Sequence, residues 1–82
     1  MTGVADLAWK EAAMQREPVS SSVVESIGYN PTTAVLEIKL VAGAIYEYFM
    51  VPPSVHAGLM KAASKGHFYG EFVRKRFNYR KL

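Results

Sequence analysis

The chain has 82 residues, of which half are hydrophobic, and it carries no cysteine and a formal net charge of +3. A chain of this length forms one domain with a modest core, and the absence of cysteine excludes disulfides, thiolate zinc sites and cysteine nucleophiles. No segment approaches the roughly 18 apolar residues that span a bilayer. The first residues lack the basic and apolar regions of a signal peptide, so we expect a cytoplasmic protein without a membrane role.

The charge is distributed unevenly along the chain. Residues 1–60 have a net charge of −3, whereas residues 61–82 have a net charge of +6. The positive potential is therefore concentrated in one part of the sequence, where it can attract phosphate groups.

Residues 4–17 have the spacing of a short helix. Apolar residues recur every three or four positions, alanines favour the helical state, and the pattern stops before Pro18. We therefore treat residues 1–18 as an N-terminal helical extension. It either packs on its own domain or frays, or it presents Leu7 and Trp9 as a docking or dimer surface.

Three segments alternate with the period of two that is typical of strands. They cover residues 22–29, 34–41 and 45–51, and turns around Pro31 and Gly43 separate them. The short connections predict a three-stranded antiparallel β-meander.

Two helices are predicted after the strands. The first covers residues 53–66, with Pro53 in its first turn and Gly66 as its C-terminal cap. The second covers residues 67–82, although Gly70 weakens it by roughly 1 kcal/mol relative to alanine. The predicted fold class is therefore α+β: a three-stranded antiparallel β-meander with two C-terminal helices packed on one face, plus a short N-terminal helix.

Several short motifs follow one another at characteristic spacings. They are Ser21-Ser22, Ile27-Gly28-Tyr29, Tyr46-Glu47-Tyr48, Val51-Pro52, Ala63-Ser64-Lys65-Gly66, and Phe68-Tyr69 followed by Val73, Arg74 and Phe77. This ordered set resembles the KTSC domain, a module at the C-terminus of some lysyl-tRNA synthetases that also occurs as a free-standing bacterial protein. The resemblance covers about residues 20–78, so we assign residues 19–82 to a KTSC-like domain.

The resemblance implies RNA binding, mainly because the module is associated with a synthetase that acts on tRNA. The chain departs from the family at two places. Phe68, Tyr69 and Gly70 stand where members typically have Tyr-Phe-Asn, and Asn30 stands where an aspartate is usual. Any role of the missing asparagine is therefore absent or moved.

The two tyrosines of the Tyr46-Glu47-Tyr48 motif have two interpretations. If the charged faces of the neighbouring strands coincide on the wet side of the sheet, both rings point towards the helices and join a core with Leu36, Ile38 and Leu40. The alternative is an exposed platform on which nucleic-acid bases stack.

A basic segment with interleaved aromatic residues occupies residues 74–81. We predict that it lies on the second C-terminal helix and contacts phosphates, with Tyr79 available for stacking and with Lys61 and Lys65 of the preceding helix in support. The predicted phosphate contacts are Arg74, Lys75, Arg76, Arg80 and Lys81. The alternative is a solvated helix face with Phe77 in the core.

No catalytic, cofactor or metal site is predicted. His56 and His67 are the only imidazoles, and no spacing supports a Ser-His-Asp triad or a two-histidine metal site. The leading prediction is a non-enzymatic nucleic-acid-binding module, with a tRNA-like RNA as its partner. The alternative is a protein-interaction or regulatory module, such as a phage-encoded one, that binds an acidic protein or self-associates through residues 4–14. We expect a monomer or a weak homodimer.

Overall fold

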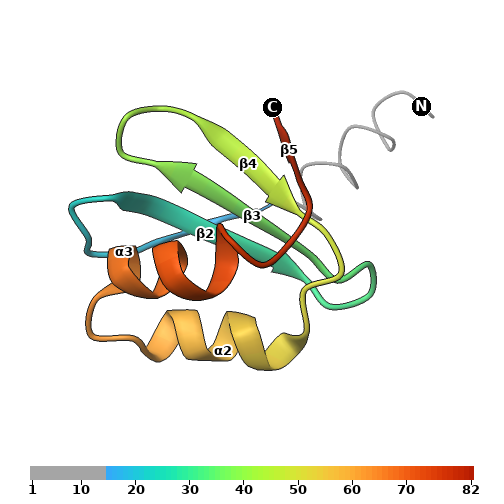
Figure 1. The fold of residues 1–82 in the computed structure, drawn as a ribbon. Coiled ribbons are helices and arrows are strands. Elements are labelled where there is room, and N and C mark those ends of the chain that lie inside the picture. Colours follow the sequence, from blue (N-terminus) through green and yellow to red (C-terminus); the bar gives the residue numbers. More distant parts are fainter. Residues whose placement is uncertain (1–14) are drawn as a thin grey trace.

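An antiparallel β-sheet forms one layer of the structure, and a helical layer covers one of its faces (Figure 1). The computed structural model describes residues 15–82. The five strands lie side by side in chain order. They are β1 (Glu17–Pro18), β2 (Val24–Asn30), β3 (Val35–Leu40), β4 (Ile45–Tyr48) and β5 (Tyr79–Lys81).

The helical layer consists of α2 (Pro53–Lys61), α3 (Lys65–Phe68) and the π-helical turn η1 (Tyr69–Val73), which continues α3. Pro53 occupies the first turn of α2, where a helix needs no backbone donor. The side chain of Ser64 accepts a hydrogen bond from the backbone N–H of His67 and so begins α3. Within residues 15–82, no helix is long and apolar enough to cross a membrane.

The central part of the sheet confirms the predicted α+β class and the β-meander. β2, β3 and β4 overlap the three predicted strands, although β4 ends three residues early, and both helical segments pack on one face (Figure 1). The side chain of Asn30 accepts a hydrogen bond from the N–H of Thr32, which stabilises the turn between β2 and β3. Ala34 has a positive φ of 59° where this turn enters β3.

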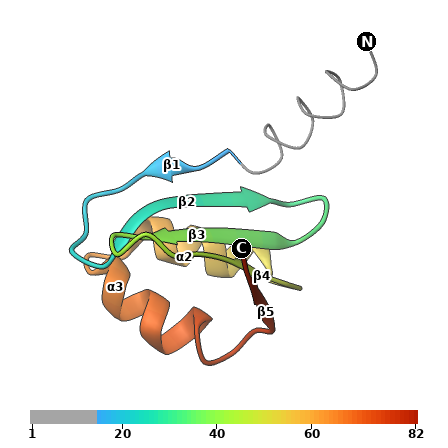
Figure 2. The same ribbon diagram turned by 90° about the horizontal axis from the view of Figure 1, so that it is seen from above.

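The prediction of three strands is wrong, because the sheet has one more strand at each edge. Figure 2 shows β1 beside β2 and β5 beside β4. Pro18 is accommodated because β1 is an edge strand, where a missing N–H leaves no gap in the ladder. β5 pairs with the outer edge of β4, whose backbone groups would otherwise lack partners in the sheet.

Both predicted helices are too long. α2 ends at Lys61, and Gly66 does not cap it but lies within α3. The second predicted helix also stops early. It ends with η1 at Val73, and a turn then leads into β5. Phe77 packs against the core and directs the chain back to the sheet. The backbone N–H of Phe49 donates to the carbonyl of Asn78, and that of Leu82 donates to the carbonyl of Ile45. These bonds extend the β4–β5 pairing at both ends.

Most of the predicted N-terminal helix lies outside the described residues. Its predicted last part is wrong, because residues 15–16 are not helical and Glu17 begins β1. The proposed boundary between residues 18 and 19 separates β1 from the domain, although β1 pairs with β2. The hypothesis that Leu7 and Trp9 form a docking surface concerns residues that the structure does not describe.

The core lies between the sheet and the helical layer. Its members come from three strands, both helical segments and the link after β4: Val24, Ile27, Leu36, Ile38, Tyr48, Val51, Leu59, Tyr69 and Val73. Gly58 of α2 allows close packing at the helical junction, since a Cβ there would lie 2.8 Å from Cζ of Phe68. The helices are therefore held against each other as well as against the sheet.

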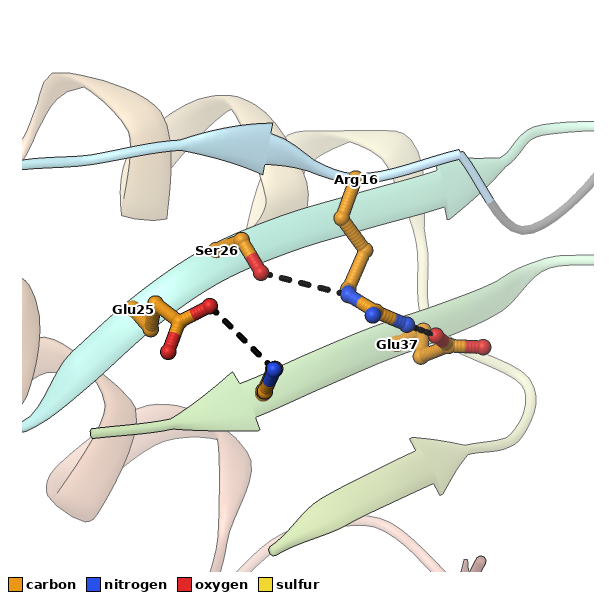
Figure 3. Close-up of polar contacts among 5 residues, drawn as sticks. Arg16, Glu25, Ser26 and Glu37 are labelled. Carbon is orange, nitrogen blue, oxygen red and sulfur yellow. Dashed lines mark hydrogen bonds and ion pairs between the residues drawn. The ribbon is translucent and has the colours of Figure 1, made fainter. Parts of the chain in front are cut away.

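The opposite face of the sheet carries the charged side chains, as predicted, but two of its glutamates are buried. Glu37 is 2% exposed and Glu47 is 9% exposed, and they stand directly opposite each other on β3 and β4. Arg16 forms an ion pair with Glu37 and also donates to the hydroxyl of Ser26 (Figure 3). Arg80 of β5 donates to Glu47 at 2.7 Å. Each carboxylate is therefore neutralised from one edge of the sheet.

The Arg16–Glu37 ion pair should contribute much more to stability than the Lys39–Glu25 ion pair on the same face. We expect Arg16→Ala to lower the free energy of unfolding by about 2–4 kcal/mol, because it leaves a buried carboxylate without its partner. Lys39→Ala is the control, since its 3.4 Å pair involves a half-exposed Glu25, and exposed pairs contribute about 0–1 kcal/mol. Urea denaturation measures both changes, and equal losses would contradict the assignment.

Candidate nucleic-acid interface

Four tyrosines gather on the helical side of β4 and β5. Tyr48 lies directly opposite Tyr79 in the register of these strands, and Tyr46 lies opposite Lys81. The rings of Tyr46 and Tyr79 meet edge to face with centroids 5.5 Å apart, and those of Tyr48 and Tyr69 do so at 5.9 Å. Such edge-to-face pairs stabilise the packing of aromatic side chains.

A hydrogen bond between the hydroxyls of Tyr48 and Tyr69, 2.5 Å apart, links the sheet to η1. Burial raises the pKa of both phenols, and for Tyr48 the hydrogen bond with Tyr69 raises it further. Both groups are therefore neutral at physiological pH. Since one hydroxyl donates to the other, the pair retains a single further O–H donor.

An open groove of about 680 Å³ lies along this cluster. Its walls are formed by Val23, Leu40, Tyr46, Tyr48, Gly66, Tyr69, Gly70, Arg74 and Tyr79. Tyr79 is 57% exposed and Tyr46 is half-buried, whereas Tyr48 is only 2% exposed. Apart from Gly70 itself, its two chain neighbours and the backbone of its own helix, no atom of residues 15–82 lies within 4 Å of the position that a Cβ of Gly70 would take. The groove therefore presents exposed ring surface beside open space. We call it the tyrosine groove.

Arg74 is the cation at the rim of the tyrosine groove. Among residues 15–82, the structure records no ion pair for this guanidinium, which is exposed. Its neighbours are engaged: Lys75 pairs with Glu71 at 3.4 Å, and Arg76 lies over the ring of Phe72 at 5.3 Å. Arg74 is thus the basic side chain best placed to meet an anionic ligand of the groove.

The structure divides the predicted set of basic residues. Arg80 and Lys81 lie on β5 and not on a helix, which corrects the prediction of a continuous basic helix. Because neighbouring side chains of a strand face opposite sides, Arg80 joins Glu47 on the far face while Lys81 lies on the groove side with Tyr46. Only part of the basic segment is therefore available at one surface.

Lys61 and Lys65 lie at the other end of the helical layer. Lys61 ends α2 and Lys65 begins α3, and Figure 1 shows this junction far from the turn that leads into β5. The ammonium of Lys65 donates to the carbonyl of Ala62 at 3.0 Å. Neither lysine is among the residues that line the tyrosine groove itself.

For the two tyrosines of the motif, the core interpretation holds fully for Tyr48. Tyr46 packs against the core and also forms part of the groove wall, while Tyr79 supplies the exposed ring. The sequence analysis did not assign a site role to Tyr69. It appears there only in the Phe68-Tyr69 pair of the family resemblance, and its hydrogen bond to Tyr48 depends on tertiary packing.

A second aromatic contact lies at the other edge of the sheet. The ring of Tyr29 stacks on the imidazole of His56 with centroids 4.7 Å apart, and its hydroxyl donates to the carbonyl of Val51 at 2.5 Å. Burial lowers the pKa of His56, and the nearby Glu17 opposes this shift. Within residues 15–82, no three His, Asp or Glu side chains are grouped to hold a metal ion.

Comparisons with known proteins identify relatives of two kinds. The sequence profile of the KTSC domain matches residues 20–77. A protein from Tsukamurella paurometabola is 41% identical over 61 residues, which are 74% of this chain and 91% of that protein. The lysine–tRNA ligase of Nostoc punctiforme is 39% identical over 61 residues, which are 74% of this chain but only 11% of the ligase.

A solved structure is also similar to this chain. The crystal structure of a KTSC domain protein from Yersinia pestis has a TM-score of 0.80 and 45% sequence identity, and the match covers 85% of this chain and 99% of that one. The similarity thus extends over nearly the whole of that protein, whereas it covers a small part of the ligases.

The hydroxyl pair of Tyr48 and Tyr69 predicts a specific pattern of mutational effects. We expect Tyr48→Phe and Tyr69→Phe each to lower the free energy of unfolding by about 1–2 kcal/mol, because each leaves one buried hydroxyl without its partner. The double variant should cost less than the sum of the two. Urea denaturation of the four proteins measures this coupling, and strictly additive losses would exclude a direct hydrogen bond.

The burial of His56 predicts that stability falls at mildly acidic pH. Because its pKa is lowered from 6.5 in the folded state, the unfolded chain takes up the proton first as the pH decreases through this value. The lost stability is regained above about pH 7. His56→Gln should flatten the dependence of the unfolding free energy on pH between about pH 5 and 8. The unfolding free energy is measured by urea denaturation at each pH. If its slope against pH were the same in the variant and the parent protein, the prediction would be wrong.

Proposed function

The chain belongs to the KTSC domain family, and we propose that it is a non-enzymatic RNA-binding module that takes unpaired nucleotides in the tyrosine groove. One observation carries this proposal: the exposed ring of Tyr79 lines the same open groove as Arg74, which has no ion pair within residues 15–82. An aromatic face beside a cation is the combination that single-stranded nucleic acids require.

Stacking would supply the sequence-tolerant part of the affinity. A base that leaves its helix exposes a π-face, and aromatic side chains bind such faces with about 1–3 kcal/mol per base. Tyr79 offers its ring to solvent, and Tyr46 supports it from the side at 5.5 Å. The groove has room for one base, since its volume is about 680 Å³. Duplex RNA presents no such free base and would bind less well.

Arg74 and Lys81 would contact the phosphates of the bound strand. Arg74 lines the groove, and Lys81 lies opposite Tyr46 on the same side of the sheet. Lys75, Arg76 and Arg80 are engaged with Glu71, Phe72 and Glu47 respectively, so they contribute less than the sequence alone suggests. So few phosphate contacts imply weak binding with a shallow salt dependence, because each contact adds only about 0.7 to the slope of log affinity against log salt concentration.

The relatives supply independent support for an RNA ligand. The similar segment of the Nostoc punctiforme protein belongs to a lysine–tRNA ligase, whose name refers to a tRNA. The free-standing relatives show that the segment also exists without the ligase. A single-stranded region of a tRNA-like RNA is therefore the ligand that we would test first.

The stacking role is tested by replacing Tyr79 in a fluorescence-anisotropy titration with labelled single-stranded RNA and tRNA. We expect Tyr79→Ala to weaken binding by about fivefold or more, which corresponds to the 1–3 kcal/mol of one stacked base. Tyr79→Phe retains the ring and should bind like the parent protein. Equal affinities of all three proteins would exclude stacking in the groove.

The phosphate role is tested by two neighbouring charge removals in the same assay. At about 0.1 M salt, loss of one phosphate contact should weaken binding about fivefold and reduce the salt slope by about 0.7. We expect this for Arg74→Gln and a smaller effect for Lys75→Gln, although both remove one positive charge. No binding of any RNA at low salt, or full displacement by a slight excess of heparin with no preference among RNAs, would overturn the proposal.

A further inference from the structure

A second hollow adjoins the tyrosine groove. Its volume is about 280 Å³, and it lies where the chain entering β2 meets the junction of α2 and α3. The residues around it are Ser20, Ser21, Ser22, Val23, Ala63, Ser64, Lys65, Gly66 and His67. Val23 and Gly66 line both this hollow and the tyrosine groove, so the two are neighbours on the surface.

The polar side chains of this hollow are of one chemical kind. They are serine hydroxyls, one ammonium and one imidazole, and no carboxylate is among the residues that line it. A site with an ammonium and several hydroxyls but no acid attracts anions and repels cations. We call it the serine–lysine hollow.

Two of these serines use their oxygens as acceptors and keep their O–H groups as donors. Oγ of Ser21 accepts hydrogen bonds from the backbone N–H groups of Val23 at 3.1 Å and Val24 at 3.2 Å. A hydroxyl oxygen has two acceptor lone pairs, so the remaining capacity of Ser21 is its O–H donor. Oγ of Ser64 likewise accepts from the N–H of His67 at 3.2 Å and retains its O–H.

Lys65 supplies the positive charge, and its ammonium is held in place. One of its three donors is used by the carbonyl of Ala62 at 3.0 Å, which leaves two for a ligand. Gly66 brings the chain close to β2, since a Cβ there would lie 3.0 Å from Cγ2 of Val23. Gly66 has no side chain that would separate the hollow from the groove.

We infer that the serine–lysine hollow is a phosphate subsite for the RNA strand whose base occupies the tyrosine groove. This inference rests on the proposed function and adds to it a second, separately placed contact. Phosphate oxygens accept hydrogen bonds and carry negative charge, which matches the O–H donors of Ser21 and Ser64 and the ammonium of Lys65. The ligand of the combined site is therefore a strand with a phosphate next to its stacked base.

Two lysines four residues apart in the sequence provide the matched test. Lys65 lines the hollow, whereas the exposed Lys61 does not. We expect Lys65→Gln to weaken the binding of labelled single-stranded RNA about fivefold at 0.1 M salt, the effect of one lost phosphate contact. Lys61→Gln should change it less than twofold, and Lys65→Arg, which keeps the charge, should restore most of the affinity. Thermal unfolding of each variant checks that the fold is retained.

A titration with inorganic phosphate at constant ionic strength separates this inference from the proposed function. We expect saturable NMR shifts of the amides of residues 21–23 and 64–67. If RNA binds but Lys65→Gln and Lys61→Gln lose affinity equally, the phosphate subsite is overturned and the proposed function stands. If no RNA binds, the proposed function fails. Saturable phosphate shifts in the hollow would then still support an anion site, and their absence would overturn it.

Discussion

Two glutamates that face each other on neighbouring strands are the constraint on which the rest of the structure depends. Glu37 and Glu47 are directly opposite in the register of β3 and β4, and both are buried on the face away from the helices. Like charges in this position repel, and burial weakens the screening by water. Arg16 and Arg80 each neutralise one carboxylate, from opposite edges of the sheet. The three central strands therefore need the segments that flank them.

The same constraint decides the composition of the tyrosine groove. Successive side chains of a strand point to opposite faces, so pairing Arg80 with Glu47 places Tyr79 and Lys81 on the helical side. A shift of β5 by one residue would exchange these faces, leaving Glu47 without its cation and the groove without its exposed ring. The structural ion pair and the candidate binding surface thus lie on opposite faces of the short strand β5.

The helical layer supplies the wall of the tyrosine groove that faces the sheet, and this wall includes a π-helical turn. In η1 the N–H of Arg74 donates to the carbonyl of Tyr69, five residues earlier, which widens the helix as in other π-helical turns. Tyr69 remains buried against Tyr48, while Arg74 emerges at the rim. Gly66 and Gly70 add no side chains of their own to this wall, and Gly66 also borders the serine–lysine hollow. The widened turn therefore forms part of the tyrosine groove, while Gly66 before it lies between the groove and the hollow.

By itself the sequence determined the β2–β4 meander and the start of α2, because alternation, turn residues and proline positions act over short distances. It left Tyr48 with two interpretations, and the structure buries this residue in the core. Only the tertiary structure decided that residues 79–81 form a strand, since the open edge of β4 provides the backbone partners. It also decided which cations are engaged. Arg80 pairs with Glu47, which lies 33 residues away in the chain, whereas Arg74 lines a groove. A basic segment shows its charges, but the partners that neutralise them are set by packing.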